Sequence, residues 1–249
     1  MARTRKALPA RIDVAHLISA GVLASVCPRP LIEEVLAQTG KASRRERLLP
    51  APAVVYYVMA LALWREAPTE EVLRVVCEGL HWLNAGADGA ESGHGGRASK
   101  AAISQARTRL GSEVMQTLAS RVLKPIAQTD APGAFYRGLR LVAFDGSSMD
   151  VADEAANAAY FGYPGTGNGH SGYPQARVLA LIECGTHDAV LAADIVPYRH
   201  SEQAMAAKML PTQLKPDMLV LADRNFYGFK LWTSANQTGQ NCSGASSLI

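Results

Sequence analysis

Two aspartates that follow short apolar runs could together bind a divalent metal ion. Asp145 follows the run 139–144 and Asp223 follows the run 218–222. Each run is short and bounded by Gly or Pro, which predicts a buried strand. Carboxylates at the carboxyl edge of a sheet offer the oxygen ligands that hard cations prefer. The pair therefore predicts metal-dependent phosphoryl chemistry, for which a third carboxylate is expected downstream, yet residues 224–249 contain no Asp or Glu.

The elements that would position these aspartates form an alternating pattern. Apolar runs predict strands over 139–145, 176–184, 189–196 and 218–223, and a helix over 201–214. Hydrophobic runs that alternate with a helix predict a mixed α/β layer. Residues 157–173 form a polar insert rich in Gly and Tyr, which predicts a long functional loop.

The first half of the chain is predicted to be helical. Two short helices lie within 13–39, broken at residues 27–30, and further helices cover 53–65, 70–83, 100–110 and 112–123. In the helix 100–110, preceded by Ser99 as N-cap and ended by Gly111, the small and apolar residues share one face. The other side presents polar side chains suited to phosphates or base edges: Lys100, Gln105, Arg107 and Arg109. Taken alone, such a helix is more typical of an ordinary solvated surface.

Charge is divided unevenly along the chain. Residues 1–140 hold 19 Lys and Arg against 12 Asp and Glu, whereas residues 141–249 hold 6 against 10. A basic first part and an acidic second part fit a nucleic-acid-binding segment followed by a metal-binding one, although ordinary surfaces also carry such an excess.

Cysteine spacing and hydropathy argue against a zinc-ribbon, disulfide-rich or membrane-spanning protein. The four cysteines are widely spaced with no CxxC pair, which favours neither a zinc ribbon nor a disulfide framework and indicates a reducing cytoplasm. The longest apolar stretch, residues 48–64, carries Pro50 and Pro52 at its start, so the remaining helix is too short for a bilayer. No membrane association is expected.

Several motifs, in order, resemble the transposases of the insertion sequence four family. They include SKAAISQARTRLG (99–111), FDGSSMDV (144–151), YFG (160–162) and LVLADRNFYGF (219–229). The resemblance covers about residues 15–232 and implies an α+β or α/β protein. It implies a helical N-terminal DNA-binding domain over 1–125 and an incomplete ribonuclease-H-like mixed sheet over 138–232. Residues 233–249 are polar and Gly-rich, which predicts a disordered tail.

The resemblance also implies an activity. In this family an Asp, Asp, Glu triad holds two Mg²⁺ (or Mn²⁺) ions that serve cleavage of element ends and their transfer to target DNA. Asp145 matches the first acid and Asp223 the second, while Arg224 would contact a phosphate or pair with a nearby acid. Because the third acid is missing, a truncated copy with impaired catalysis is expected. Its partners would be DNA and either a second copy or an intact transposase.

Two other functions remain open at this point. The chain could be a non-catalytic DNA-binding protein that recognises element ends and competes with an intact transposase. Alternatively, it could be a stand-alone metal nuclease or phosphatase that uses Asp145 and Asp223 with a nearby acid such as Glu202 or Asp150.

Overall fold

The computed structural model describes residues 21–43, 45, 49–84, 98–166, 169–186, 189–226, 228, 231, 233 and 241–242. Side chains are described for these residues except 80–84, 166, 170 and 241–242. The chain forms two compact units, residues 1–122 and 123–249, and each is considered by itself.

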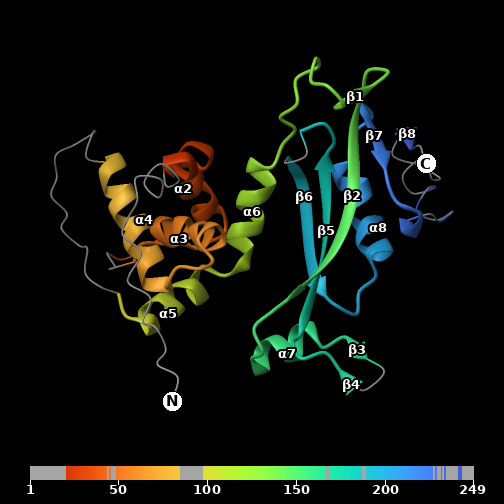
Figure 1. Ribbon diagram of the computed structural model, residues 1–249. Helices are drawn as coiled ribbons and strands as arrows, with labels where there is room; N and C mark the ends of the chain where they lie inside the picture. The colour runs from red at the N-terminus through yellow and green to blue at the C-terminus, as the bar shows by residue number, and fades with distance from the viewer. Residues whose placement is uncertain are drawn as a thin grey trace. The chain divides into compact units, whose positions relative to one another are not determined.

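The first unit consists of helices (Figure 1). They are α2 (Arg29–Gln38), α3 (Ala51–Leu63), α4 (Thr69–Asn84), α5 (Lys100–Leu110) and α6 (Ser112–Val122). Prolines stand at the starts of α2 and α3, where a missing N–H costs no helical hydrogen bond. Among the described residues, no helix combines the length and apolarity needed to cross a membrane.

The apolar face of α5 joins the core of this unit. Ile103, Ala106 and Leu110 are buried against residues of the other helices, among them Ile32, Val35, Val55, Val72 and Val114. The Ser99 side chain accepts a hydrogen bond from the Ala102 N–H at 3.2 Å, which caps the helix. Gly111 ends it with φ of +73°. The predicted cap, face and end of this helix are confirmed, whereas most of the helix expected before residue 27 lies outside the described residues.

The second unit is built on a mixed sheet. Its strands are β1 (Phe135–Tyr136), β2 (Leu139–Asp150), β5 (Gln175–Glu183), β6 (Val190–Pro197), β7 (Met218–Leu221) and β8 (Asn241–Cys242), in the order β6-β5-β2-β7-β8 with β1 pairing β2. β2, β5 and β6 are antiparallel, while β7 runs parallel to both β2 and β8. Helix α8 (Glu202–Gln213) packs on the sheet through Met205, Ala206, Met209 and Leu210. The molecule is therefore of the α+β class.

Two sequence predictions about this unit are wrong in detail. The strand predicted over 139–145 continues to Asp150, because β5 pairs with it up to Asp150↔Gln175 and compensates for the loss of apolar residues. Residues 157–173, predicted to be a long loop, contain most of helix α7 (Ala155–Phe161). They also contain a small hairpin of β3 (Gly165–Thr166) and β4 (Gly169–His170). Of the segment 233–249, predicted to be a disordered tail, the structure describes only residue 233 and β8, so the tail stays a prediction.

The buried carboxylate of Glu183, at the end of β5, joins this strand to residues 126–127 by hydrogen bonds and to Arg140 of β2 by an ion pair. The Glu183 side chain is completely buried and accepts hydrogen bonds from the N–H groups of Ile126 (3.1 Å) and Ala127 (2.9 Å). It also pairs with Arg140, whose guanidinium donates to the Ala127 carbonyl at 3.2 Å. Burial raises the pKa of Glu183, but these N–H groups and Arg140 lower it by more, so the net pKa lies below its ordinary value. The carboxylate is therefore charged and fully paired.

Candidate metal and DNA-binding sites

Asp145 and Asp223 occupy equivalent positions on neighbouring parallel strands. The pairing of β2 with β7 runs from Arg140↔Met218 to Ala143↔Leu221. Each aspartate lies two residues beyond the last pair, Asp145 within β2 and Asp223 two residues after the end of β7, and both are exposed. Because β2 continues, Asp145 is not at a strand end but at the point where β2 loses its β7 partner. Residues far apart in sequence are thus brought to one edge.

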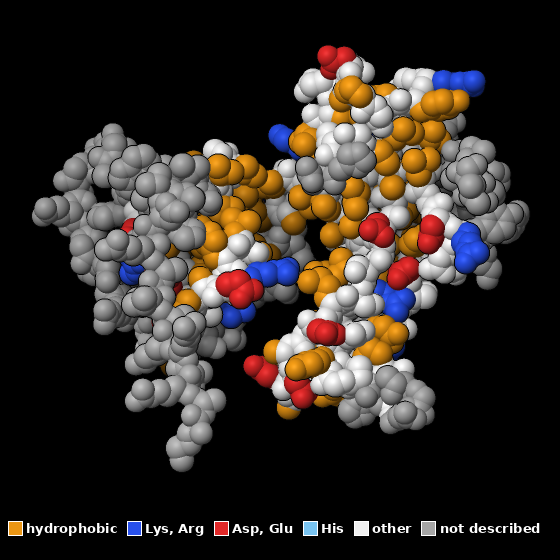
Figure 2. Space-filling model, viewed as in Figure 1, with side chains coloured by type: hydrophobic (Ala, Val, Ile, Leu, Met, Phe, Trp, Pro, Cys, Tyr) orange, Lys and Arg blue, Asp and Glu red, His pale blue; other side chains and the backbone are white. Residues whose placement is uncertain are grey.

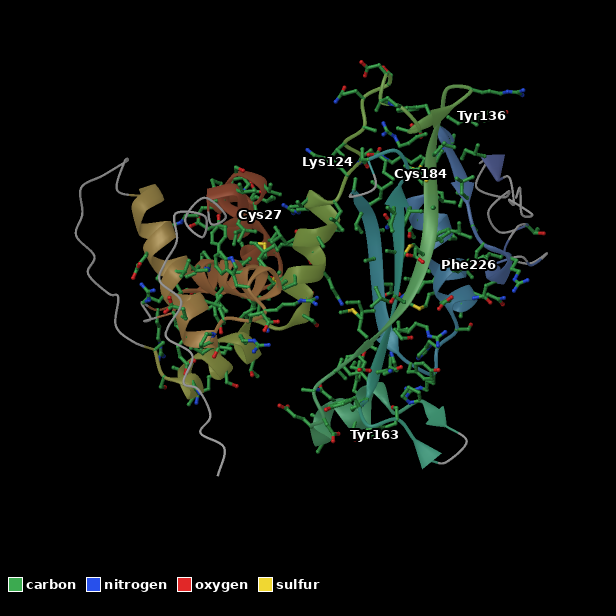
Figure 3. All side chains as sticks on the ribbon, viewed as in Figure 1. Cys27, Lys124, Tyr136, Tyr163, Cys184 and Phe226 are labelled. Carbon is green, nitrogen blue, oxygen red and sulfur yellow. The ribbon has the colours of Figure 1, made fainter. Side chains whose placement is uncertain are left out.

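A pair of packed aromatic rings lies next to the two aspartates in the chain. Phe144, next to Asp145, packs against Phe226, three residues after Asp223, with ring centroids 5.9 Å apart (Figure 3 labels Phe226). Both rings are buried and belong to the core of the second unit.

Asp223 is held by the turn that follows it. Its Oδ1 accepts a hydrogen bond from the Asn225 N–H at 2.8 Å, and its carbonyl accepts one from the Phe226 N–H at 3.1 Å. This pattern is an Asx turn, and it leads into the short 3₁₀ helix η1 (Arg224–Phe226). Among the described residues, the other carboxylate oxygen of Asp223 forms no hydrogen bond or ion pair, so it can take a further partner.

The two carboxylates at this edge of the sheet suit a hard cation, but they are few for a complete metal site. Two exposed carboxylates offer the oxygen ligands that Mg²⁺ and Mn²⁺ prefer. Over the described residues, no group of three or more His, Cys, Asp or Glu side chains is arranged to hold a metal ion. Asp150 lies at the far end of β2 and accepts a hydrogen bond from Gln175 at 2.7 Å, so it does not join Asp145.

Glu202, at the start of α8, is closer to the aspartates than Asp150. Its carboxylate accepts a hydrogen bond from the Asn225 side-chain amide at 3.0 Å and faces the Arg177 guanidinium at 3.5 Å. It also lies against Gly146, directly after Asp145. The sequence had suggested Glu202 only as an alternative third acid. The involvement of Gly146, Asn225 and Arg177 was missed, because hydrogen bonds between distant segments leave no periodic signal.

The exposed polar side chains of α5 form the second candidate site. Lys100, Gln105, Arg107 and Arg109 are all exposed, as predicted from the helical spacing. Lys100 makes a long ion pair of 3.5 Å with Glu70. The pKa of Glu70 is lowered, chiefly by its own backbone N–H and then by Thr69 and Lys100. These side chains can therefore offer cations to a phosphate backbone.

Other charged groups are spread over the second unit. Arg224 is exposed, and within the described part of the chain it forms no ion pair, so the predicted pairing with an acid is not observed there. In Figure 2 acidic and basic side chains lie among apolar ones on the visible face of this unit. Arg224 thus remains available to an external anion.

Comparisons with known proteins found one family model and one relative that match the chain. Residues 17–120 match the family model described as insertion element 4 transposase N-terminal. Over 211 residues the chain is 26% identical to the transposase InsG for insertion sequence element IS4 of Escherichia coli (strain K12). The match covers 85% of this chain and 45% of that relative, so the chain spans about half the length of the relative. No solved structure matches. The two matches together support a transposase of the insertion element 4 family.

Proposed function

We propose that the chain acts in DNA transposition, with Asp145 and Asp223 as ligands of divalent metal ions in a ribonuclease-H-like catalytic layer. The observation that carries the proposal is the equal register of the two aspartates beyond the paired part of β2 and β7. The strand order β6-β5-β2-β7 and the family matches support it. The proposed substrates are the ends of the element and the target DNA.

Each residue would have a simple role. Asp145 and Asp223, whose carboxylates are exposed, would hold divalent metal ions. Such ions would supply Lewis-acid chemistry for the attacking and leaving oxygens of a phosphodiester. Arg224, which directly follows Asp223, is placed to contact a phosphate. Since residues 224–249 supply no third carboxylate, these 249 residues alone are proposed to cleave DNA poorly.

Metal titration tests the proposal. Isothermal titration of the purified chain with MnCl₂ should show binding that Asp145→Asn and Asp223→Asn each weaken by about tenfold or more. Asp217→Asn is the matched control, because Asp217 is also exposed and lies just before β7. Binding that survives both substitutions would refute the assignment of the metal ligands.

A cleavage assay tests the proposed impairment. Duplex DNA carrying the ends of the element that encodes the chain is incubated with protein and Mg²⁺. Slow or absent strand cleavage is expected, because one of three carboxylates that stabilise the transition state is lacking. Efficient cleavage that depends on Asp145 would show that two acids suffice or that another group replaces the third.

A second candidate function is DNA binding without catalysis, favoured by the exposed cations of α5. Arg107→Ala and Arg109→Ala should each weaken binding to element-end DNA and reduce the slope of log affinity against log salt by about 1. Arg29→Ala is the matched control on α2, where Arg29 is exposed and paired with Glu33 at 2.7 Å. Equal losses in all three variants, or no loss at all, would count against a DNA contact by α5.

The proposed assembly and compartment follow from the substrate. Two element ends must be joined, so we propose that the chain acts with a second copy or with an intact transposase. It would work in the cytoplasm, where the element's DNA lies. Light scattering of the chain with and without end DNA measures the number of copies, and a monomer in both states would refute self-association.

A further inference from the structure

We infer that the first turn of α8 positions Asp223, and that Gly146 is required because it leaves room for the Glu202 carboxylate. The inference rests on the proposed metal site, since it assigns the residues that would hold one of its ligands in place. Glu202, Gln203 and Asn225 are positioning residues in this scheme.

Asn225 is held by α8 from two sides. Its side-chain amide donates to Glu202 Oε2 at 3.0 Å, and its carbonyl accepts a hydrogen bond from Gln203 Nε2 at 2.6 Å. The Asn225 N–H in turn donates to Asp223 Oδ1 at 2.8 Å. The Ser201 side chain caps α8 by accepting from the Ala204 N–H at 3.2 Å, so this first turn is itself fixed. A continuous set of hydrogen bonds therefore runs from α8 to the Asp223 carboxylate.

Glu202 also packs against the strand that carries Asp145. A Cβ atom built on Gly146 would lie 2.5 Å from Glu202 Cδ and 2.8 and 2.9 Å from its two oxygens. Such contacts are far shorter than van der Waals distances, so any side chain at this position must displace Glu202. On its other side Glu202 faces Arg177, whose guanidinium lies 4.8 Å from the centre of the Tyr198 ring. A shift of the Glu202 carboxylate would therefore alter its contacts with Arg177 and Asn225.

The geometry favours a positioning role for Glu202 over metal binding. Successive side chains of a strand point to opposite faces, so the Gly146 position that Glu202 contacts lies on the other face from the Asp145 side chain. The two oxygens of Glu202 face Asn225 and Arg177. Residues that orient a metal ligand in this way commonly affect metal affinity about 10- to 100-fold when removed.

Manganese titration of the full 249-residue chain separates the two roles. Glu202→Ala should weaken Mn²⁺ binding about tenfold, because Asn225 loses a partner. Glu202→Gln should stay within about twofold of the unmodified chain, because its carbonyl oxygen can still accept the Asn225 hydrogen bond. Equal losses in both variants would identify Glu202 as a metal ligand and overturn the positioning role. No loss in Glu202→Ala would overturn it as well.

Substitution of Gly146 tests the steric part. Gly146→Ala should also weaken Mn²⁺ binding about tenfold. In the double variant Gly146→Ala/Glu202→Ala, Mn²⁺ binding should be little weaker than in Glu202→Ala alone, because the clash with the Glu202 carboxylate is absent. Gly172→Ala is the matched control, because a Cβ there would meet nothing within 4 Å. Additive losses in the double variant would show that the two residues act independently and would contradict the inference.

A measurement without metal distinguishes failure of the inference from failure of the metal site. Hydrogen exchange of the Asn225 amide, followed by NMR, should be faster in Glu202→Ala than in the unmodified chain or in Glu202→Gln. If the chain binds no Mn²⁺ through Asp145 and Asp223, the proposed site is wrong, but the exchange data still decide whether α8 holds Asp223. Equal Asn225 exchange rates in all three proteins would refute the inference whatever the metal does.

Discussion

Replacing Glu183 with alanine should destabilise the second unit by about 3 to 5 kcal/mol. Glu183 is fully buried, and its removal leaves Arg140, whose side chain is only 16% exposed, without a counter-charge. The N–H groups of Ile126 and Ala127 lose their acceptor at the same time. Glu183→Gln keeps the volume and one carbonyl oxygen, so a smaller loss of about 2 kcal/mol is expected.

Peptide-resolved hydrogen exchange is the suitable assay, because a chain of two units need not unfold in one step. Protection of peptides from β2 and β5 should fall by about a hundredfold or more in Glu183→Ala. Peptides from α2 to α5 should be unchanged, and Glu154→Gln, at an exposed position, is the matched control. Losses below about 1 kcal/mol would refute the reasoning that the buried carboxylate is charged and paired.

The same residue predicts a dependence on pH. Because the pKa of Glu183 is lower in the folded chain than in the unfolded one, its carboxylate stabilises the fold at neutral pH. That stabilisation is lost as the pH falls below about 4.3 and through the folded pKa. The difference in unfolding free energy between the unmodified chain and Glu183→Gln should therefore shrink on acidification. A difference that grows at low pH would contradict the assigned sign.

Three further substitutions test packing and helix capping within each unit. Gly185→Ala should lower the midpoint of thermal unfolding, because Gly185 has φ of +84° and a Cβ there would lie 2.5 Å from the Ala134 nitrogen; an unchanged midpoint would contradict this contact. Ser99→Ala should destabilise the first unit by about 1 kcal/mol in denaturant unfolding, and Ser99→Thr should restore most of it; equal stability of all three would exclude the cap. Ile32→Ala should cost the first unit about 2 to 5 kcal/mol by hydrogen exchange, since Ile32 is completely buried, while protection of β2 should stay the same.

Periodic features of the fold could be predicted from the sequence. The helix 100–110 was found with its cap, buried face and end, because all three depend on residues close together in the chain. The predicted ends of strands β5, β6 and β7 agree with the observed ends to within two residues, since each strand is a bounded apolar run. The extension of β2 to Asp150 was missed, because residues 145–150 are held by pairing with β5 and not by burial of their own side chains.

The candidate metal site could be predicted only in part. Asp145 and Asp223 were found because each follows an apolar run, and the parallel pairing of β2 with β7 agrees with that expectation. The hydrogen bonds of Glu183 with Ile126 and Ala127, and those of Asn225 with α8, join segments of no particular pattern. Such contacts depend on the final packing, so no local rule of the sequence reveals them.

The parallel pairing of β2 with β7 also bears on the order of folding. β2 and β5 are antiparallel neighbours, whereas β7 reaches β2 only after β5, β6 and α8 have been passed along the chain. Closing so long a loop costs more chain entropy and is slower than pairing nearby segments. On the ribosome Asp145 is therefore made well before its partner aspartate, and the pair cannot assemble until β7 has emerged and docked.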